Sequence, residues 1–284
     1  MAMRTNKLLG KIALVTGASR GNGKGIAIGL AEAGATVYVT GRTMNQGDSK
    51  NGLPGGLQQT EEEIRQQGGI CIAVRCDHTN DSEVKKVFEQ IEQDQNRLDI
   101  LVNNVWGGYE TLFNEKGEYV WEYPFWEQLS SQWDSMFAAG VRAHWIASRL
   151  AAKIMVTQQS GLIVNISHWA GQKYSGNVCY GVSKAATDRL TADTSHDLQP
   201  YQVAVVSLYP GLVRTERVMR AAEYLDLSNS ESPQFLGKVV AALTSDPTIM
   251  AKSGKVLVAA QLAMDYGITD IDGKQPRPLT LDQA

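Results

Sequence analysis

The sequence predicts an α/β fold in which about seven parallel strands form one doubly wound sheet with helices on both faces. Two observations predict it. Short apolar runs rich in β-branched residues recur along the 284 residues, and segments with helical character separate them. Strands that alternate with helices imply parallel strands joined by right-handed crossovers. Because no repeat or linker divides the chain, we expect residues 1–284 to form a single domain.

The expected strands share the continuous apolar character of strands that are buried on both faces of a sheet. They are residues 11–16, 36–40, 70–76, 100–103, 162–167, 203–208 and 255–259. A helix from about Gly21 to Ala33 follows the first strand and is ended by Gly34. A second helix, about 82–95, has one apolar stripe and a charged opposite face, and a long helical stretch covers about 132–156.

Composition excludes several function classes. A net charge of −3 and a pI near 5.9 give no general attraction to nucleic acid or to anionic membranes. No apolar run approaches the roughly 20 residues of a membrane helix. The cysteines Cys71, Cys76 and Cys179 have neither metal-ligand spacing nor a pairing pattern, so we expect reduced thiols and no metal site. Met1 to Leu14 resembles a short signal sequence, but its cleavage would destroy the first strand. We therefore expect a soluble, cytoplasmic protein.

A glycine-rich turn, TGASRGNG at 16–23, joins the first strand to the first helix. Gly17 allows the sharp turn, Gly21 lets the backbone approach a pyrophosphate, and Gly23 lets the helix pack closely on the sheet. The helix N-terminus offers unpaired N–H groups and a positive dipole end to phosphates. The position of this glycine-rich turn inside the first βαβ unit predicts a dinucleotide-binding site.

A tyrosine and a lysine four residues apart, Tyr180 and Lys184, stand on one face of a predicted helix. A free tyrosine has a pKa of about 10, and a lysine charge beside it is expected to lower that value toward the working range. The strand that precedes this helix ends by delivering Ser167 toward the same place. This grouping predicts acid–base chemistry.

These motifs together resemble the short-chain dehydrogenase/reductase family over nearly the whole chain. The matching residues are TGASRGNG at 16–23, Asp77, NN at 103–104, NIS at 165–167, YGVSK at 180–184 and PG at 210–211, in the family's order. The segments GLIVNIS, YGVSKAATDRL, YPGLVRTE and SGKVL are similar to one vertebrate-type subgroup. The resemblance implies a Rossmann-type three-layer fold and hydride transfer between a nicotinamide and a carbonyl or alcohol substrate.

The resemblance also implies site residues. Tyr180 would protonate the developing alkoxide, Lys184 would hold the nicotinamide ribose, and Ser167 would hold the carbonyl oxygen. Asp77 would lie near the adenine, Asn103 would support the central sheet and the adenosine side, and Thr215 would meet the nicotinamide amide. The expected cofactor-binding set is Gly17, Ser19, Arg20, Gly21, Asn22, Gly23, Arg42, Asp77, Asn103, Tyr180, Lys184, Pro210, Gly211, Val213 and Thr215.

The cofactor expected from the sequence is NADP(H) rather than NAD(H). An NAD site needs an acidic residue about 20 positions after the glycines, and the second strand instead ends in Thr40-Gly41-Arg42-Thr43. Arg42, helped by Arg20, would pair with a 2′-phosphate, which suits a guanidinium fork.

Three departures from the family pattern are visible. Asn103-Asn-Val-Trp106 places an indole near the nicotinamide pocket, and Gly140 stands where a helix asparagine often completes a proton relay. We hypothesise that Gly140 leaves room for a water. Either Ser167 or His168 can contact the carbonyl, and we favour Ser167 because a hydroxyl both donates and accepts. The departures leave open a catalytically impaired NADP(H)-binding sensor or scaffold. A related enzyme class, such as an epimerase or an enoyl reductase, is the other alternative, and the Tyr–Lys spacing disfavours the enoyl reductase.

Three further segments bear on substrates and partners. Residues 44–57 form a polar inserted loop, residues 106–133 an unusually aromatic one, and residues 215–235 the expected lid. The aromatic segment can line an apolar substrate mouth or make a subunit contact, and the tail from Met264 is expected to be a surface or interface arm. By resemblance, helices from 132–156 and the one bearing Tyr180 would form a homodimer or homotetramer. The expected partner is otherwise a small carbonyl or alcohol substrate.

Overall fold

The computed structural model describes residues 6–49 and 52–283. Their seven strands form one parallel sheet in the order β3-β2-β1-β4-β5-β6-β7. The strands are β1 (Ile12–Thr16), β2 (Thr36–Gly41), β3 (Ile70–Arg75), β4 (Ile100–Asn103), β5 (Gly161–Ile166), β6 (Val203–Tyr209) and β7 (Val256–Val258). The predicted fold class is confirmed, and each strand lies within one or two residues of its expected range.

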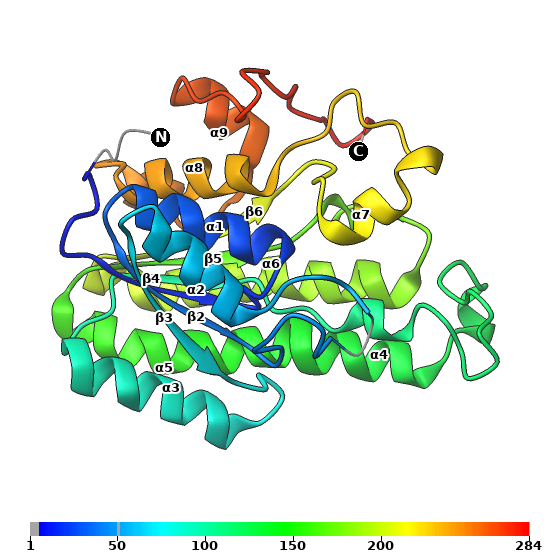
Figure 1. Ribbon diagram of the computed structural model, residues 1–284, viewed down its shortest axis with the longest axis horizontal. Helices are drawn as coiled ribbons and strands as arrows, with labels where there is room; N and C mark the ends of the chain where they lie inside the picture. Colours follow the sequence, from blue (N-terminus) through cyan, green and yellow to red (C-terminus); the bar gives the residue numbers. More distant parts are fainter. Residues whose placement is uncertain (1–5, 50–51, 284) are drawn as a thin grey trace.

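Helices cover both faces of this sheet (Figure 1). One face carries α1 (Gly21–Glu32), α2 (Leu57–Gln66), α8 (Pro233–Thr244) and α9 (Ala259–Asp265). The other carries α3 (Asp81–Gln95), α5 (Ala143–Gln158) and α6 (Val178–Leu198), with α4 (Ser130–Phe137) leading into α5. The short α7 (Glu216–Arg220) lies beyond the end of β6. None of the helices in the described part of the chain has the length and apolar character that crossing a bilayer requires.

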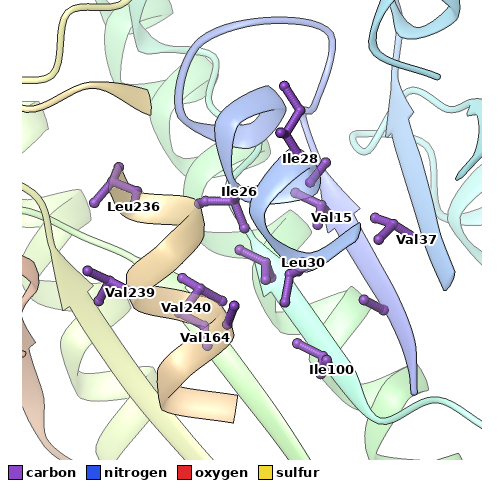
Figure 2. Close-up of a cluster of buried hydrophobic side chains, with 14 of the residues drawn as sticks. Val15, Ile26, Ile28, Leu30, Val37, Ile100, Val164, Leu236, Val239 and Val240 are labelled. Atoms are coloured by element: carbon purple, nitrogen blue, oxygen red, sulfur yellow. The ribbon is translucent and has the colours of Figure 1, made fainter. Parts of the chain in front are cut away.

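The helices α1 and α8 lie side by side on the sheet and share one apolar core (Figure 2). Ile26 and Leu30 of α1 meet Val239 and Val240 of α8 above Val164 of β5, and all five side chains are buried. The helices approach closely because glycines stand at the contact: a Cβ on Gly25 would lie 2.1 Å from the backbone of Pro233. This contact fixes the position of the helix that follows the glycine-rich turn.

The predicted long helix over 132–156 is interrupted. A π-helical turn at Ala138–Arg142 separates α4 from α5, with Gly140 at its middle. Such turns accommodate an extra residue in a helix and often stand near functional sites. Here the interruption lies where the indole of Trp106 packs against Gly140.

The chain reverses its winding direction between β1 and β4, the two central strands. In open α/β sheets, ligands bind beyond the carboxyl ends of the strands at such a switch point. The loops that follow β1, β4, β5 and β6 all line one cavity of about 770 Å³ at this place.

Candidate active site

The glycine-rich turn between β1 and α1 forms one end of this cavity. Gly17 (φ 68°) and Gly21 (φ 55°) adopt left-handed backbone conformations that favour glycine. A Cβ on Gly23 would lie 2.4 Å from the carbonyl oxygen of Gly17, so only glycine lets the helix approach this closely. Asn104 fixes the turn from β4, because its side-chain amide donates to the carbonyl oxygens of Thr16 at 2.9 Å and Gly17 at 3.0 Å.

A carboxylate occupies the start of α1. The N–H of Gly21 donates to the side chain of Glu216, the first residue of α7, at 2.9 Å. Helix N-termini bind anions through such free N–H groups. The contact with the chain's own carboxylate therefore shows that this N–H is free to donate to an anion, which fits the pyrophosphate of a dinucleotide.

The two arginines expected at a 2′-phosphate both face the cavity but already have partners. Arg42 forms an ion pair with Glu110, a residue of the segment after β4. Arg20 donates to the carbonyl oxygens of Pro54 at 2.9 Å and Gly55 at 3.0 Å, in the inserted loop. A phosphate at Arg42 would have to compete with the Glu110 carboxylate. The predicted 44–57 loop is thus tied to the glycine-rich turn; Lys50 and Asn51 lie outside the described residues.

Most of the expected cofactor-binding residues line this one cavity. They are Gly17, Ser19, Arg20, Gly21, Asn22, Arg42, Asp77, Tyr180, Lys184, Pro210, Gly211, Val213 and Thr215. Gly23 does not line it and acts through close packing.

Asn103 does not reach the cavity either. Its side chain is completely buried, and its amide donates to Asn165 at 2.8 Å and to Ser148 at 2.9 Å. It therefore ties β4 to β5 and α5. The expected support of the central sheet is present, whereas contact with the adenosine side is not; Asn104 lines the cavity in its place.

Tyr180 and Lys184 project from the first turns of α6 into the middle of the cavity. Asn177 caps this helix by accepting from the N–H of Tyr180 at 2.9 Å. Both side chains are buried, at 8% and 7% exposure. The Tyr180 hydroxyl interacts with that of Tyr109. The Tyr180 hydroxyl therefore lies beside a second phenol in the cavity, whose lining includes both residues.

The electrostatics of this pair differ from the sequence prediction. Burial, followed by the neighbouring Tyr109, raises the pKa of Tyr180 well above its ordinary value, and Lys184 does not lower it. The Lys184 ammonium instead lies 4.3 Å from the ring centre of Trp106 and donates to the carbonyl oxygen of Ile166 at 3.3 Å. Burial lowers the pKa of Lys184 to about 8. The prediction of a tuned phenol was wrong for this structure, because removal from water outweighs the ammonium.

Ser167 and His168, the two candidates for the carbonyl contact, both line the cavity. The Ser167 hydroxyl lies 3.4 Å from the carbonyl oxygen of Lys184 and also interacts with the Asp188 carboxylate. The His168 ring lies 5.4 Å from that of Tyr180, and its Nδ1 accepts from the N–H of Ala170 at 3.0 Å. Burial lowers the His168 pKa to about 4, so the neutral ring keeps its proton on Nε2.

A buried carboxylate continues the helix face that carries Tyr180 and Lys184. Asp188, one turn after Lys184, accepts from the hydroxyl of Tyr209 and interacts with Ser167 and Ser207. Its charge raises the pKa of Lys184 against the effect of burial. The sequence shows the four-residue spacing from Lys184 to Asp188, but this spacing alone does not indicate that Asp188 acts on Lys184.

The space beside Gly140 is filled. A Cβ on Gly140 would lie 2.5 Å from the indole ring of Trp106, which also contacts Tyr180 edge-on at 5.6 Å between ring centres. The hypothesis that Gly140 leaves room for a water was therefore wrong. The indole of Trp106 and the glycine at position 140 depend on each other, because the ring occupies the space that a side chain at position 140 would need.

This exchange makes a specific prediction. Gly140→Asn should lower activity and thermal stability together, since the new side chain and the indole compete for the same space and overpacking costs about 1–3 kcal/mol. Adding Trp106→Ala to Gly140→Asn should recover much of the stability. Thermal unfolding of the two single variants and the double variant measures this coupling. Additive losses would contradict the direct packing of residues 106 and 140.

The aromatic segment 106–133 divides into two parts. Trp106, Tyr109 and Trp121 surround Tyr180, with Trp121 at 5.3 Å between ring centres. Phe113, Tyr119, Phe125 and Trp126 form exposed pairs away from it. Trp106 and Tyr109 thus line the cavity, as one alternative predicted, whereas a subunit contact by the exposed pairs stays a prediction. The order of the aromatic residues in the sequence gave no signal for this division.

The predicted lid, residues 215–235, and the tail from Met264 line the remaining side of the cavity. Val213, Thr215 and Arg217 line the cavity from the segment after β6, as does Leu279 from the tail. Asn229 of the lid exchanges two hydrogen bonds with the backbone of Arg277, so the tail packs along the lid. Glu110, Glu216 and Arg217 were missed by the sequence analysis because nothing in their spacing connects them to the glycine-rich turn.

The fold and the cavity together define the class. A doubly wound sheet whose glycine-rich turn borders a cavity that also holds a buried tyrosine and lysine is typical of nicotinamide-dependent oxidoreductases. The chain is a member of the short-chain dehydrogenase/reductase family: the family model described as short chain dehydrogenase matches residues 11–225. It is therefore an NAD(P)-dependent oxidoreductase.

Relatives agree with this assignment. The chain is 43% identical over 279 residues to dehydrogenase/reductase SDR family member 1 of Mus musculus, covering 93% of this chain and 84% of the relative. A crystal structure of a short-chain type dehydrogenase/reductase from Mycobacterium marinum superposes with a TM-score of 0.73 at 27% identity, covering 91% and 97%. A putative gluconate 5-dehydrogenase from Beutenbergia cavernae, solved with bound NADP, gives 0.73 at 26% identity, covering 90% and 97%. The first of these belongs to the subgroup that the sequence segments resemble.

Proposed function

We propose that this protein is an NADPH-dependent carbonyl reductase that acts on ketones or aldehydes, and on secondary alcohols in reverse. The observation that supports it most is the buried pair Tyr180 and Lys184, which lines the cavity that begins at the glycine-rich turn. A substrate carbonyl oxygen would lie beside the Tyr180 hydroxyl, near the position of the Tyr109 hydroxyl. Because burial raises the Tyr180 pKa, the phenol is neutral at working pH and serves as the proton donor that reduction needs.

The roles proposed for the other residues follow their positions. Gly21 and the start of α1 would hold the pyrophosphate, and Thr215 with Lys184 would hold the nicotinamide end. The bound cofactor supplies the hydride. Ser167 would hold the carbonyl oxygen, which requires its hydroxyl to turn from the Lys184 carbonyl; His168 offers an Nε2–H donor on the same wall. Lys184, with a pKa of about 8, is charged at neutral pH and would return a proton to Tyr180.

An assay of NADPH oxidation tests this function. A panel of aldehydes, steroids, quinones and short keto esters should contain compounds that support steady consumption of NADPH. Binding of NADPH without consumption by any of them would instead favour the sensor or scaffold that the departures from the family pattern left open.

The cofactor preference depends on Arg42 and Glu110. We propose NADP(H), because no acid ends β2 and the Arg42 guanidinium faces the cavity. The Glu110 carboxylate competes with a 2′-phosphate for Arg42, and both side chains are about a third or more exposed, at 42% and 33%. Exposed ion pairs contribute 0–1 kcal/mol, so Glu110→Gln should tighten NADPH binding by up to about 5-fold.

Titration calorimetry with NADPH and NADH measures this effect. NADH affinity should stay nearly constant, since NADH has no 2′-phosphate. Glu115→Gln, the same charge change on an exposed residue that does not line the cavity, is the control. Weaker NADPH binding in Glu110→Gln would mean that the carboxylate assists the cofactor rather than competing with it.

We also propose that the protein is cytoplasmic and forms a homodimer or homotetramer. Trp133 and Trp145 are each 44% exposed and line a shallow apolar groove with Phe137, on the helices where the family resemblance places subunit contacts. Large aromatic side chains dominate the energetics of protein interfaces.

A further inference from the structure

One cation on the lid faces the cavity without an anionic partner. The Arg217 guanidinium lines the cavity and lies 5.2 Å from the ring centre of Tyr109. Among the residues that the structure describes, no carboxylate lies within ion-pair distance of it. Glu110, the acid that acts on it from further away, is already paired with Arg42. Half-buried charges are normally paired, so a free guanidinium in a cavity indicates a ligand anion.

The like charges around Arg217 strengthen this requirement. Burial lowers the pKa of Arg217, and the Arg220 charge lowers it further, against the opposite influence of Tyr109 and Glu110. Arg217 in turn lowers the pKa of Arg20. An anion bound to Arg217 would offset the repulsion among these like charges.

The direction of Arg217 separates it from the cofactor's phosphates. Its neighbour on α7, Glu216, points at the N–H of Gly21, which is the expected pyrophosphate position. Successive side chains on a helix are turned by about 100°. Arg217 accordingly points away from Gly21 and onto Tyr109, whose hydroxyl interacts with that of Tyr180. One aromatic ring therefore separates the cation from the proposed proton donor.

Aromatic side chains line the cavity between the two groups. Trp106 and Tyr109 both line it, and Trp106 lies edge-on to Tyr109 and Tyr180, at 6.1 and 5.6 Å between ring centres. Aromatic walls of this kind bind ring systems by stacking and edge contacts.

We propose that the substrate is an anionic carbonyl compound: a ketone or aldehyde on an aromatic or other flat ring, with a carboxylate at its far end that binds Arg217. This inference rests on the proposed reductase function and adds the substrate class to it. The carbonyl is placed at Tyr180, the ring lies against Trp106 and Tyr109, and the carboxylate forms a charge-assisted, two-pronged contact with the guanidinium.

The experiment compares 4-acetylbenzoate with its methyl ester, which has the same ring and ketone but no charge. Binding of each to the NADP⁺-loaded protein is measured by tryptophan fluorescence, and kcat and KM by NADPH oxidation. The variants are Arg217→Gln, Arg217→Lys and Arg220→Gln. The last removes the same charge three residues further along α7, at a residue that does not line the cavity.

The wild-type protein and Arg220→Gln should bind the acid about 10- to 100-fold more tightly than the ester, as expected for hydrogen bonds to a charged group. Arg217→Gln should lose this preference because its affinity for the acid falls. Its affinities for the ester and for NADPH should be unchanged. Arg217→Lys should restore part of it, because a lysine keeps the charge but not the fork.

Equal binding of acid and ester by the wild-type protein would overturn the inference, as would an equal loss for both in Arg217→Gln. A loss of NADPH affinity in Arg217→Gln would assign the guanidinium to a cofactor phosphate and would also overturn it. Arg217-dependent binding of the acid without any NADPH oxidation would uphold the anion site while contradicting the reductase function. The two proposals therefore fail separately.

Discussion

Replacing Tyr180 by phenylalanine is expected to lower the turnover number by about 10²- to 10⁴-fold, the usual contribution of a positioned proton donor. NADPH affinity should be nearly unchanged, because the ring keeps its contacts with Trp106 and Trp121 and only the hydroxyl is lost. Stopped-flow measurement of the hydride-transfer step, together with a binding titration, separates the two effects.

Tyr109→Phe is the matched comparison for this variant. It removes a hydroxyl from the same cavity, but one that the proposed reaction does not use as the proton donor. We expect it to retain most of the turnover. Equal losses of turnover in the two variants would show that the Tyr180 hydroxyl has no special role as the proton donor. Full activity in Tyr180→Phe would contradict the assignment of Tyr180 as the proton donor.

The second large effect is on stability. Gly25→Ala should destabilise the fold by about 3 kcal/mol, at the upper end of the range for overpacking, because the new methyl would lie 2.1 Å from the backbone of Pro233. The higher helix propensity of alanine offsets only about 1 kcal/mol of this. Backbone atoms cannot rotate aside, so α1 would have to move away from α8.

Urea unfolding without cofactor measures this cost. Gly41→Ala is the control, since its methyl would meet nothing closer than Leu57 at 3.7 Å. The displaced helix carries the N–H groups of the glycine-rich turn, so Gly25→Ala should also weaken NADPH binding. Stability close to that of the wild-type protein would mean that the contact of α1 with α8 is more adaptable than its geometry indicates.

The sheet could be predicted from the sequence because each strand is a continuous apolar run. Such a run can be recognised from its own residues, without knowledge of residues distant in the chain. The positions of Tyr180, Lys184 and the glycine-rich turn followed from local spacing on one helix or one turn. Their convergence followed from the rule that parallel strands deliver their loops to one edge.

The remaining features depend on residues that are distant in the chain. The Trp106 ring fills the space beside Gly140, and the partners of Arg42 and of the Gly21 N–H come from Glu110 and Glu216. No spacing rule connects these residues. The pKa of Tyr180 was predicted in the wrong direction for a similar reason: a four-residue spacing shows that Lys184 is near, but burial is a property of the whole cavity.

The central claim is that the Tyr180 hydroxyl faces the reacting carbonyl beside the nicotinamide. A crystal structure of the protein with NADP⁺ and 4-acetylbenzoate tests it most directly. The account predicts that the ketone oxygen accepts a hydrogen bond from the Tyr180 hydroxyl, with the nicotinamide ring on the adjoining wall. A nicotinamide bound away from Tyr180, or a ketone oxygen out of hydrogen-bond reach of the Tyr180 hydroxyl, would contradict it.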